Sequence, residues 1–406
     1  MLATCLGCGC ACDDIQLRVE ADRIREARNA CSLGQDWFGD GSVSSRIVVG
    51  GRDASLGDAL DLAVDVLGRA ARPLVYLAPD ISCEAQRAAI GLGDTLRATV
   101  DSVTSGTVRG AVLAAQELGR ASATLGEIRN RADVVVFWGV DPSQRYPRFW
   151  TRYAPEPTGL HVGGRRDRIV LAVDVGSARG PEDADDRLAV MPDREVAVLE
   201  ELTAGAVRPD HGSPVPPLLA SILKGRYVAL IADAEPETGG VGHNDGRSAA
   251  LLMLAQALNG PTRCAYVALR AGGNRSGADA CLTSQTGYPL AVDFSRGHPR
   301  YRPHEHAAAR LERGGVDAVL IVGSVGLIPF PATRLAGVST IVIGPRATET
   351  PFAVSAAVDT AVAGIHESGT ALRMDDVPLP LTAAVRGPRA VVDIVLDLSR
   401  RLASAR

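Results

Sequence analysis

Cysteines at short spacings open the chain and are its clearest chemical signal. Cys5, Cys8 and Cys12 follow one another in the pattern C-x2-C-x3-C, and Cys31 comes shortly after them. Four thiolates can form a tetrahedral cage for a [4Fe–4S] cluster or a structural zinc ion. Cys10 interrupts the pattern and could replace a neighbouring ligand. The residues leave three possibilities open, which are an iron–sulfur cluster, zinc, and free thiols without a metal.

A β-hairpin is needed to return Cys31 to the first cysteines. Apolar and polar residues alternate from Ile15 onward, which predicts a hairpin over residues 14–29. Gly7 and Gly9 would let the backbone turn tightly around a metal. The first 50 residues are therefore expected to form a small cysteine-rich hairpin domain.

After residue 50, apolar runs alternate with helical patterns, which is typical of an α/β fold. Most runs are continuously hydrophobic, as parallel strands buried on both faces require. Ser55 followed by Asp58 predicts the N-cap of the first helix. The predicted strands are residues 74–77, 134–138, 169–175, 228–231, 266–269, 319–322 and 340–343. The later predicted helices are residues 84–96, 112–118, 194–206, 249–258 and 306–313, with a final helix opening at Pro388.

A chain of 406 residues is too long for one ordinary core. We expect three parts. Residues 1–50 form the cysteine hairpin domain, and residues 51–165 with 310–406 form a first doubly wound lobe. Residues 166–309 form a second doubly wound lobe that is inserted in the first.

Composition argues against two kinds of partner. The net charge is −4, and 22% of the residues are charged, so nothing marks a nucleic-acid binder. No apolar run reaches the roughly 18 residues of a membrane span, and the N-terminus lacks the segments of a signal peptide. We therefore expect a cytoplasmic protein with no nucleic-acid or membrane partner. Cytoplasmic cysteines are reduced, which favours metal binding over disulfides.

Polar loops follow the predicted strands where α/β sheets bind ligands, at the carboxyl ends of parallel strands. Glycines in such loops can bring backbone N–H groups close to an anion. Each loop is also compatible with an ordinary strand-to-loop turn. The candidate residues are Gly139, Asp141, Asp174, Arg179, Gly369 and Thr370.

Several blocks of the sequence occur in the order of one known family. They are the N-terminal cysteines with NACSLG at 29–34, TLGEIRNRAD at 124–133 running into VVVFWGVDP, TGYP at 286–289 with DFSRG at 293–297, and AGIHESGT at 363–370. Each block is short, but together they span nearly the whole chain. In them the chain resembles the B subunit of formylmethanofuran dehydrogenase. The resemblance implies a molybdopterin oxidoreductase-like fold of the formate dehydrogenase/DMSO reductase type, whose loops hold a bis-pterin guanine dinucleotide.

The sequence departs from this family at the position of the metal ligand. In active members, a cysteine or selenocysteine before the TLGEI block binds molybdenum or tungsten. Residues 101–108 contain no cysteine, and Thr104 or Thr107 stands at that position. A threonine hydroxyl is a poor donor beside a thiolate, although Asp101 or Ser102 could still bind a metal through oxygen. A Ser-Asp-Pro expected after residue 322 is also replaced, by Gly-Ser-Val. We therefore expect molybdopterin or tungstopterin to be absent and the loops to be vestigial.

The resemblance suggests two functions. The first is a non-redox structural subunit of the formyltransferase/hydrolase complex of aerobic methylotrophs, which moves a formyl group from tetrahydromethanopterin to a furan-type carrier and hydrolyses it to formate. Its implied partners are an amidohydrolase-like A subunit, a formyltransferase-like D subunit and a C subunit. The alternative is an active molybdo- or tungstopterin formylmethanofuran dehydrogenase. The absence of cysteine from residues 84–263 favours the structural subunit. A free-standing electron-transfer protein is disfavoured because a second cluster motif is missing.

Overall fold

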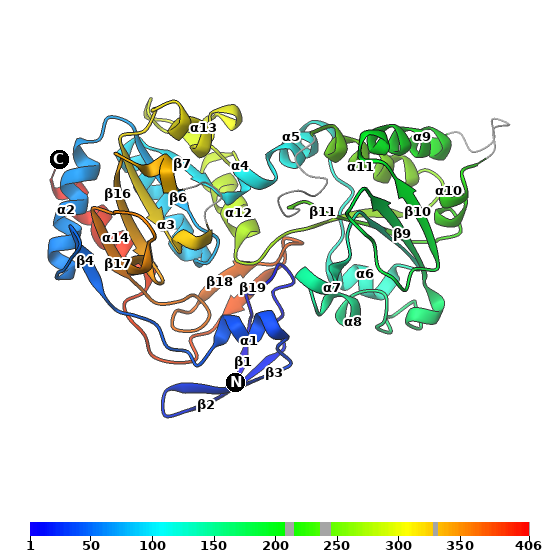
Figure 1. Cartoon of the computed structure of the whole chain (residues 1–406), viewed down its shortest axis with the longest axis horizontal. Coiled ribbons are helices and arrows are strands. Elements are labelled where there is room, and N and C mark those ends of the chain that lie inside the picture. The colour runs from blue at the N-terminus through cyan, green and yellow to red at the C-terminus, as the bar shows by residue number, and fades with distance from the viewer. Residues whose placement is uncertain (208–214, 236–244, 328–331, 406) are drawn as a thin grey trace. The chain divides into compact units, whose positions relative to one another are not determined.

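The computed structural model describes residues 1–207, 215–235, 245–327 and 332–405. The chain divides into two compact units (Figure 1). Unit 1 comprises Met1–Thr107 and Gly272–Arg406, and unit 2 comprises Val108–Ala271. Both units combine helices with sheets of largely parallel strands. No helix in the described ranges is long and apolar enough to cross a membrane.

Within the described residues, unit 1 has a nine-stranded sheet with the order β14-β13-β7-β6-β15-β16-β17-β4-β5. The strands from β7 to β17 in this order are parallel, and the strands at both edges are antiparallel. The parallel strands are buried on both faces, which explains their continuous apolar runs. The bounds are β4 (Ile47–Val49), β5 (Arg52–Asp53), β6 (Pro73–Leu77), β7 (Thr99–Ser102), β13 (Val292–Asp293), β14 (Arg300–Tyr301), β15 (Ala318–Val322), β16 (Ser339–Gly344) and β17 (Ala356–Asp359).

Helices cover both faces of this sheet. The core on one face joins α2, α3, α12 and α14 to inward residues such as Val75 and Leu320. The core on the other face joins α13 to the alternate residues Leu74 and Val319. Ser55 caps α2 in a capping box with Asp58, as predicted. The helices of unit 1 are α1 (Ser32–Phe38), α2 (Leu56–Arg69), α3 (Cys83–Leu96), α4 (Val103–Thr107), α12 (Arg275–Thr286), α13 (Ala307–Glu312) and α14 (Val391–Ser404).

The N-terminal segment of unit 1 forms the predicted hairpin. Strands β1 (Leu2–Ala3), β2 (Ile15–Glu20) and β3 (Arg23–Arg28) make a small antiparallel sheet. Ala21 and Asp22 turn the hairpin with φ angles of 49° and 59°, as a tight two-residue turn requires. A second hairpin, β18 (Gly369–Leu372) with β19 (Pro378–Leu381), packs against the cysteine loop through Ala371 and Leu6.

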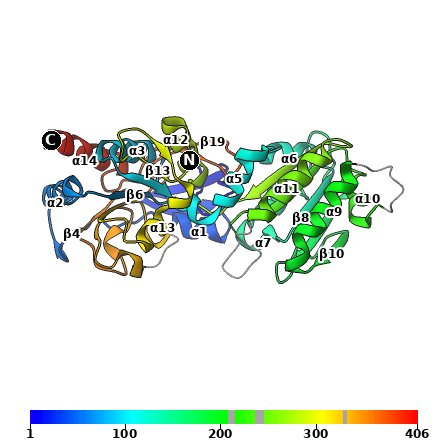
Figure 2. The same cartoon turned by 90° about the horizontal axis from the view of Figure 1, so that it is seen from above.

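Unit 2 is built on a sheet whose described strands are all parallel, in the order β10-β9-β8-β11-β12. Figure 2 shows α9 and α11 side by side along this sheet. The strands are β8 (Val134–Trp138), β9 (Ile169–Val175), β10 (Asp186–Val190), β11 (Val228–Asp233) and β12 (Cys264–Leu269). The helices are α5 (Arg109–Leu118), α6 (Leu125–Arg131), α7 (Pro142–Arg145), α8 (Phe149–Arg152), α9 (Glu195–Val207), α10 (Pro217–Ile222) and α11 (Asp245–Leu258).

The prediction of an α/β protein with parallel sheets is confirmed, but the units divide the chain elsewhere than the predicted lobes. The strand at residues 134–138, expected in the first lobe, lies between β9 and β11 in the sheet of unit 2. Conversely, β13 and β14, expected in the inserted lobe, belong to the sheet of unit 1. Strand pairing between distant segments decides membership, and local apolar patterns do not reveal it. The final helix begins at Val391, three residues after Pro388.

Candidate functional site

The N-terminal cysteine cluster consists of Cys5, Cys8, Cys12 and Cys31. The first three are buried, and Cys31 is half-buried at the N-cap of α1. The Cys5 N–H donates to the Cys12 carbonyl over 2.9 Å and closes the loop that carries the first three. The hairpin therefore presents Cys31 on one short helix and the other thiols on one tight loop.

Electrostatics couple the thiols of this cluster. Burial raises the pKa of Cys5 to about 12, against the effect of the Gly7 N–H that donates to its sulfur over 3.3 Å. Charge on Cys8, Cys12 or Cys31 raises the pKa of Cys5 further. A bound cation would remove this repulsion, because metals bind cysteine as the thiolate.

Two glycines lie against the Cys5 sulfur and form a cradle for it. A Cβ on Gly7 would lie 2.6 Å from the Leu33 carbonyl oxygen and 3.4 Å from Cys5 Sγ. A Cβ on Gly34 would lie 3.4 Å from the same sulfur. Four thiolates suit a soft metal chemically. In the part of the chain that the structure describes, however, no three His, Cys, Asp or Glu side chains already stand together as a single-ion site.

The two threonines at the expected metal-ligand position make protein contacts. Thr104 is fully buried in α4, and its hydroxyl donates to Asp279 Oδ1 over 2.6 Å. The Thr107 hydroxyl donates to the Val103 carbonyl over 3.0 Å, within its own helix. Both hydroxyls therefore support local structure.

Asp101, the neighbouring acid, also makes hydrogen bonds within the protein. Its carboxylate is fully buried and accepts the Ser105 hydroxyl at 2.7 Å and the backbone N–H groups of Ser102, Ala291 and Ala307 at 2.9, 3.1 and 2.6 Å. Burial raises the pKa of Asp101, although these hydrogen bonds oppose the rise. Asp101 thus joins β7 to the loop before β13 and to the first residue of α13.

In unit 2, the loop after β8 has the geometry of a turn. Gly139 has a φ of 59° and donates its N–H to the Val173 carbonyl over 2.7 Å. Asp141 caps α7 by accepting the Ser143 N–H over 2.8 Å. These contacts explain both residues structurally. Gly139 makes the turn after β8, and Asp141 is the N-cap of α7.

Asp174, at the carboxyl end of β9, forms a compact ion cluster. It accepts Arg179 Nη1 at 2.9 Å, Arg187 Nη1 at 2.6 Å and the Gly180 N–H at 2.8 Å. Burial alone would raise the pKa of Asp174, but these donors hold it below its usual value. The carboxylate and the cation predicted from the sequence therefore pair with each other.

A buried charge network at the same sheet edge was missed by the sequence reasoning. Glu195 accepts the Trp138 indole N–H at 2.7 Å and Arg247 Nε at 2.8 Å, and all three side chains are buried. The available signal was an acidic residue at or near the carboxyl end of two strands, Asp174 in β9 and Asp233 in β11. Two further ion pairs belong to this edge, Arg145 with Asp233 and Arg270 with Glu235.

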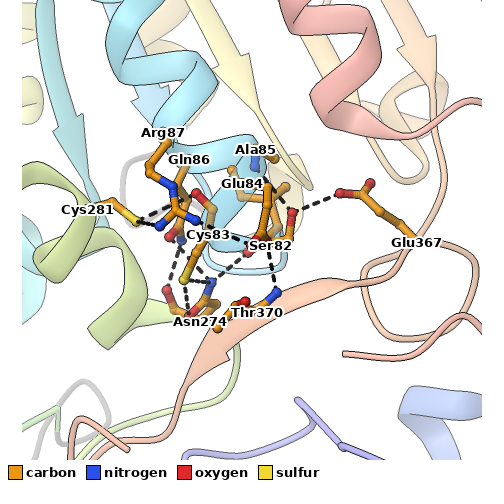
Figure 3. Close-up of polar contacts among 11 residues, drawn as sticks. Ser82, Cys83, Glu84, Ala85, Gln86, Arg87, Asn274, Cys281, Glu367 and Thr370 are labelled. Carbon is orange, nitrogen blue, oxygen red and sulfur yellow. Dashed lines mark hydrogen bonds and ion pairs between the residues drawn. The ribbon is translucent and has the colours of Figure 1, made fainter. Parts of the chain in front are cut away.

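Gly369 and Thr370 approach an anion, but the anion is a residue of the chain. The Thr370 N–H donates to Glu84 Oε2 over 2.8 Å (Figure 3). A Cβ on Gly369 would lie 2.5 Å from the same oxygen and 3.0 Å from Ser82 Cβ. The glycine therefore allows β18 to approach the start of α3.

His366 and Glu367, in the block at 363–370 that resembles the family, contact different partners. His366 Nε2 lies 2.7 Å from the Gly41 carbonyl oxygen, and burial lowers the pKa of this imidazole. Glu367 accepts the Ser82 hydroxyl at 2.8 Å and the Val391 N–H at 2.9 Å. One carboxylate thereby joins the N-cap of α3 to the first turn of α14.

A pocket of about 490 Å³ lies at the carboxyl ends of the parallel strands of unit 1. Asp80 follows β6 there, Ser324 follows β15 and Arg346 follows β16. The hydroxyl and N–H of Ser324 both donate to Asp80. The buried Trp37 indole N–H, also in the lining, has no hydrogen-bond partner among the described residues. The carboxyl ends of parallel strands are where α/β sheets bind ligands. Ser324 belongs to the Gly-Ser-Val segment that replaces the expected Ser-Asp-Pro, and in the described structure it bonds to Asp80.

Comparison with known proteins decides the family. No family model matches the chain. It is 30% identical, over 96% of its length and 94% of theirs, to the B subunits of tungsten-containing formylmethanofuran dehydrogenase 2 from Methanococcus maripaludis and from Methanocaldococcus jannaschii. The chain belongs to the family of formylmethanofuran dehydrogenase B subunits.

A solved structure shares the fold of this family member. A chain in the crystal structure of the formyltransferase/hydrolase complex from Methylorubrum extorquens, in complex with methylofuran, matches with a TM-score of 0.74 at 22% identity. The match covers 88% of the present chain and 99% of that chain. The mixed α/β architecture is therefore one that a solved structure also has.

The candidate residues of this family member fall into separate groups. Thr104, Thr107, Gly369 and Thr370 lie in unit 1, and Gly139, Asp141, Asp174 and Arg179 lie in unit 2. Within unit 2, the structure brings Asp174 and Arg179 together as an ion pair. Within unit 1, Thr104 and Thr370 contact different acids, Asp279 and Glu84.

Proposed function

We propose that this chain is a cytoplasmic, non-redox structural subunit of a formyltransferase/hydrolase complex in tetrahydromethanopterin-linked one-carbon metabolism, from formaldehyde to formate. The environment of Thr104 carries the proposal. At the position where the family resemblance expects a thiolate or selenolate ligand, this buried hydroxyl donates to Asp279. A protonated alcohol already used in a structural contact is a poor ligand for molybdenum or tungsten.

The neighbouring oxygen donors support the same proposal. Asp101 accepts four hydrogen bonds, and binding a metal would require it to give some of them up. The proposed chain keeps the molybdopterin oxidoreductase-like fold as a framework without molybdopterin or tungstopterin. The loops around Gly139, Asp174 and Gly369 are then vestiges of a pterin site.

The N-terminal cysteine cluster is proposed to hold a [4Fe–4S] cluster through Cys5, Cys8, Cys12 and Cys31. The burial of Cys5, Cys8 and Cys12, the effect of the other three thiols on the pKa of Cys5, and the close packing of Gly7 and Gly34 against its sulfur support this assignment. An iron–sulfur group supplies electron transfer when bound, and any metal at this position also crosslinks the loop to α1. Zinc and free thiols are the alternatives that the experiment below separates.

The proposed assembly contains an amidohydrolase-like A subunit, a formyltransferase-like D subunit and a C subunit, with a furan-type formyl carrier nearby. The support is the fold shared with a chain of the Methylorubrum complex, which was crystallised with methylofuran. The formyl chemistry belongs to the partner subunits in this proposal, and the present chain supports the assembly.

The alternative function is an active tungsto- or molybdopterin formylmethanofuran dehydrogenase. One observation favours it, because both curated relatives are tungsten-containing enzymes that match over nearly the whole chain. In that case a metal ligand other than a thiolate would have to come from the segment around Asp101.

Elemental analysis of the purified native complex tests the proposal. We expect molybdenum and tungsten far below one atom per chain, and near-stoichiometric amounts of either would overturn it. Iron near four atoms per chain supports a [4Fe–4S] cluster. One zinc atom per chain, in addition to any zinc bound by the partner subunits, supports a zinc site.

Variants of the cysteines give a second test. A complex with Cys5→Ser and Cys12→Ser should lose that metal, and a matched complex with Cys264→Ser should keep it.

A further inference from the structure

Two cysteines outside the N-terminal cysteine cluster meet where α3 packs on α12 in unit 1. Cys83 is the first residue of α3, and Cys281 lies in the second half of α12. Both side chains are buried, and each thiol shifts the pKa of the other. Cys281 Sγ lies 3.6 Å from the Cys83 carbonyl oxygen. Figure 3 shows the Cys83 sulfur beside Asn274, and Cys281 beside Arg87.

The surroundings favour a thiolate on Cys83 and a thiol on Cys281. Asn274 Nδ2 donates to Cys83 Sγ over 3.3 Å, and the N-terminus of α3 adds positive potential. The hydrogen bond from Cys281 holds the pKa of Cys83 below its usual value, with help from Asn274 and Arg87 and against burial. The same bond raises the pKa of Cys281. One sulfur is thus prepared as nucleophile, and its neighbour carries the proton.

The Arg87 side chain connects Cys281 to solvent. Arg87 Nη1 lies 3.9 Å from Cys281 Sγ, while the Arg87 side chain is 48% exposed. It is held in place by an ion pair with Glu84 at 3.3 Å. A rotamer change of this one arginine would open a path for a small oxidant.

We propose that Cys83 and Cys281 are a redox-active pair that closes to an intramolecular disulfide when a peroxide oxidises it. The Cys83 thiolate attacks one oxygen of hydrogen peroxide, the O–O bond breaks, and hydroxide leaves, so that Cys83 becomes a sulfenic acid. The Cys281 thiol then attacks the Cys83 sulfur. The S–O bond breaks, water leaves with the Cys281 proton, and the S–S bond forms.

The position of the pair in the chain gives this bond a specific consequence. Cys83 and Cys281 are 198 positions apart, and the whole of unit 2 lies between them in the sequence. The disulfide therefore closes a covalent loop that contains unit 2 and ties α3 to α12 at its base. A crosslink across so long a loop stabilises the folded chain.

Peptide mapping of the peroxide-treated native complex tests this inference. After free thiols are alkylated and the complex is digested without reductant, we expect mass spectrometry to find the linked Cys83–Cys281 peptide. Limited proteolysis inside unit 2 gives a second readout. The fragments should migrate together on a non-reducing gel and separate after reduction.

Variants of the chain provide the controls. Cys264 is buried with a pKa raised to about 12 and should react about 100-fold or more slowly than Cys83, because the thiolate is the reactive form. Cys264→Ser should leave the linked peptide unchanged, and Cys83→Ser and Cys281→Ser should each abolish it. The inference would be overturned if Cys83 and Cys281 could still be alkylated after peroxide treatment. It would also be overturned if either cysteine were oxidised to a sulfinic acid without forming the disulfide. This outcome does not depend on the metal content that tests the proposed function.

Discussion

The Thr104 hydroxyl donates to Asp279 Oδ1 over 2.6 Å, although the two residues are 175 positions apart in the chain. The bond joins α4 to α12 within unit 1. Thr104 is fully buried, so its hydroxyl depends on an acceptor from the protein. At the position where the family resemblance expects a metal ligand, the chain therefore has a contact between two helices.

Replacing Thr104 tests the value of this bond. Thr104→Val removes the donor but keeps the shape of the side chain, and should lower the free energy of unfolding by about 1.5–3 kcal/mol, as for a hydrogen bond to a charged group. Thr104→Ser keeps the hydroxyl and should cost less. Urea unfolding of the full-length chain measures both, and equal stability of the two variants would argue against a structural role for the bond.

The ion cluster of Asp174 predicts a dependence of stability on pH. The donors around this buried carboxylate hold its pKa below 3.8, so its contribution is present at neutral pH and is lost as the pH falls from about 3.8 through the folded-state pKa. Asp174→Asn should cost about 2 kcal/mol at pH 7, and the difference from wild type should shrink in acid. Asp193→Asn, at an exposed acid, is the control and should change stability by less than about 0.5 kcal/mol.

Glu367 should show the opposite dependence on pH. Burial raises its pKa above 4.5, so the contribution of this carboxyl to stability is greatest in acid and is lost as the pH rises through the folded-state pKa. Glu367→Gln should flatten that dependence, because an amide does not titrate in this pH range. The glutamine amide can still accept the Val391 N–H and donate to Ser82, so both contacts are kept.

Glu367→Ala removes both contacts and should cost about 2 kcal/mol more than Glu367→Gln, since two helix starts lose a partner. Thermal unfolding of the full-length chain between pH 4.5 and 8 separates the variants. Parallel curves for wild type and Glu367→Gln would contradict the assignment of this carboxyl as the titrating group.

Gly7→Ala tests the cradle of the N-terminal cysteine cluster. The new Cβ would lie 2.6 Å from the Leu33 carbonyl oxygen, so the loop must shift, at a cost of about 1–3 kcal/mol. We expect the variant complex to lose the metal assigned to the cluster. Gly91→Ala is the control, because a Cβ there meets nothing within 4 Å in α3 and alanine favours a helix. Retention of full metal content by Gly7→Ala would show that the cradle is not needed.

The sequence alone was sufficient where the signal is local. Alternating residues after Asp14 predicted the hairpin, and Ser55 with Asp58 predicted the cap of α2. The strands at residues 134–138 and 169–175 agree with β8 and β9, because continuous apolar runs are characteristic of strands buried on both faces. The family followed from short blocks in a fixed order, which need no knowledge of contacts.

Tertiary structure alone decided the partners of the polar residues and the membership of the strands. The sequence pattern cannot show that Thr104 bonds to Asp279, that Thr370 bonds to Glu84, or that Cys83 meets Cys281. These pairs are 175, 286 and 198 positions apart. Hydrophobic periodicity indicates which face of an element is buried, but hydrogen-bond partners depend on which elements pack together. For the same reason, β8 could be assigned to unit 2 only from its pairing with β9 and β11.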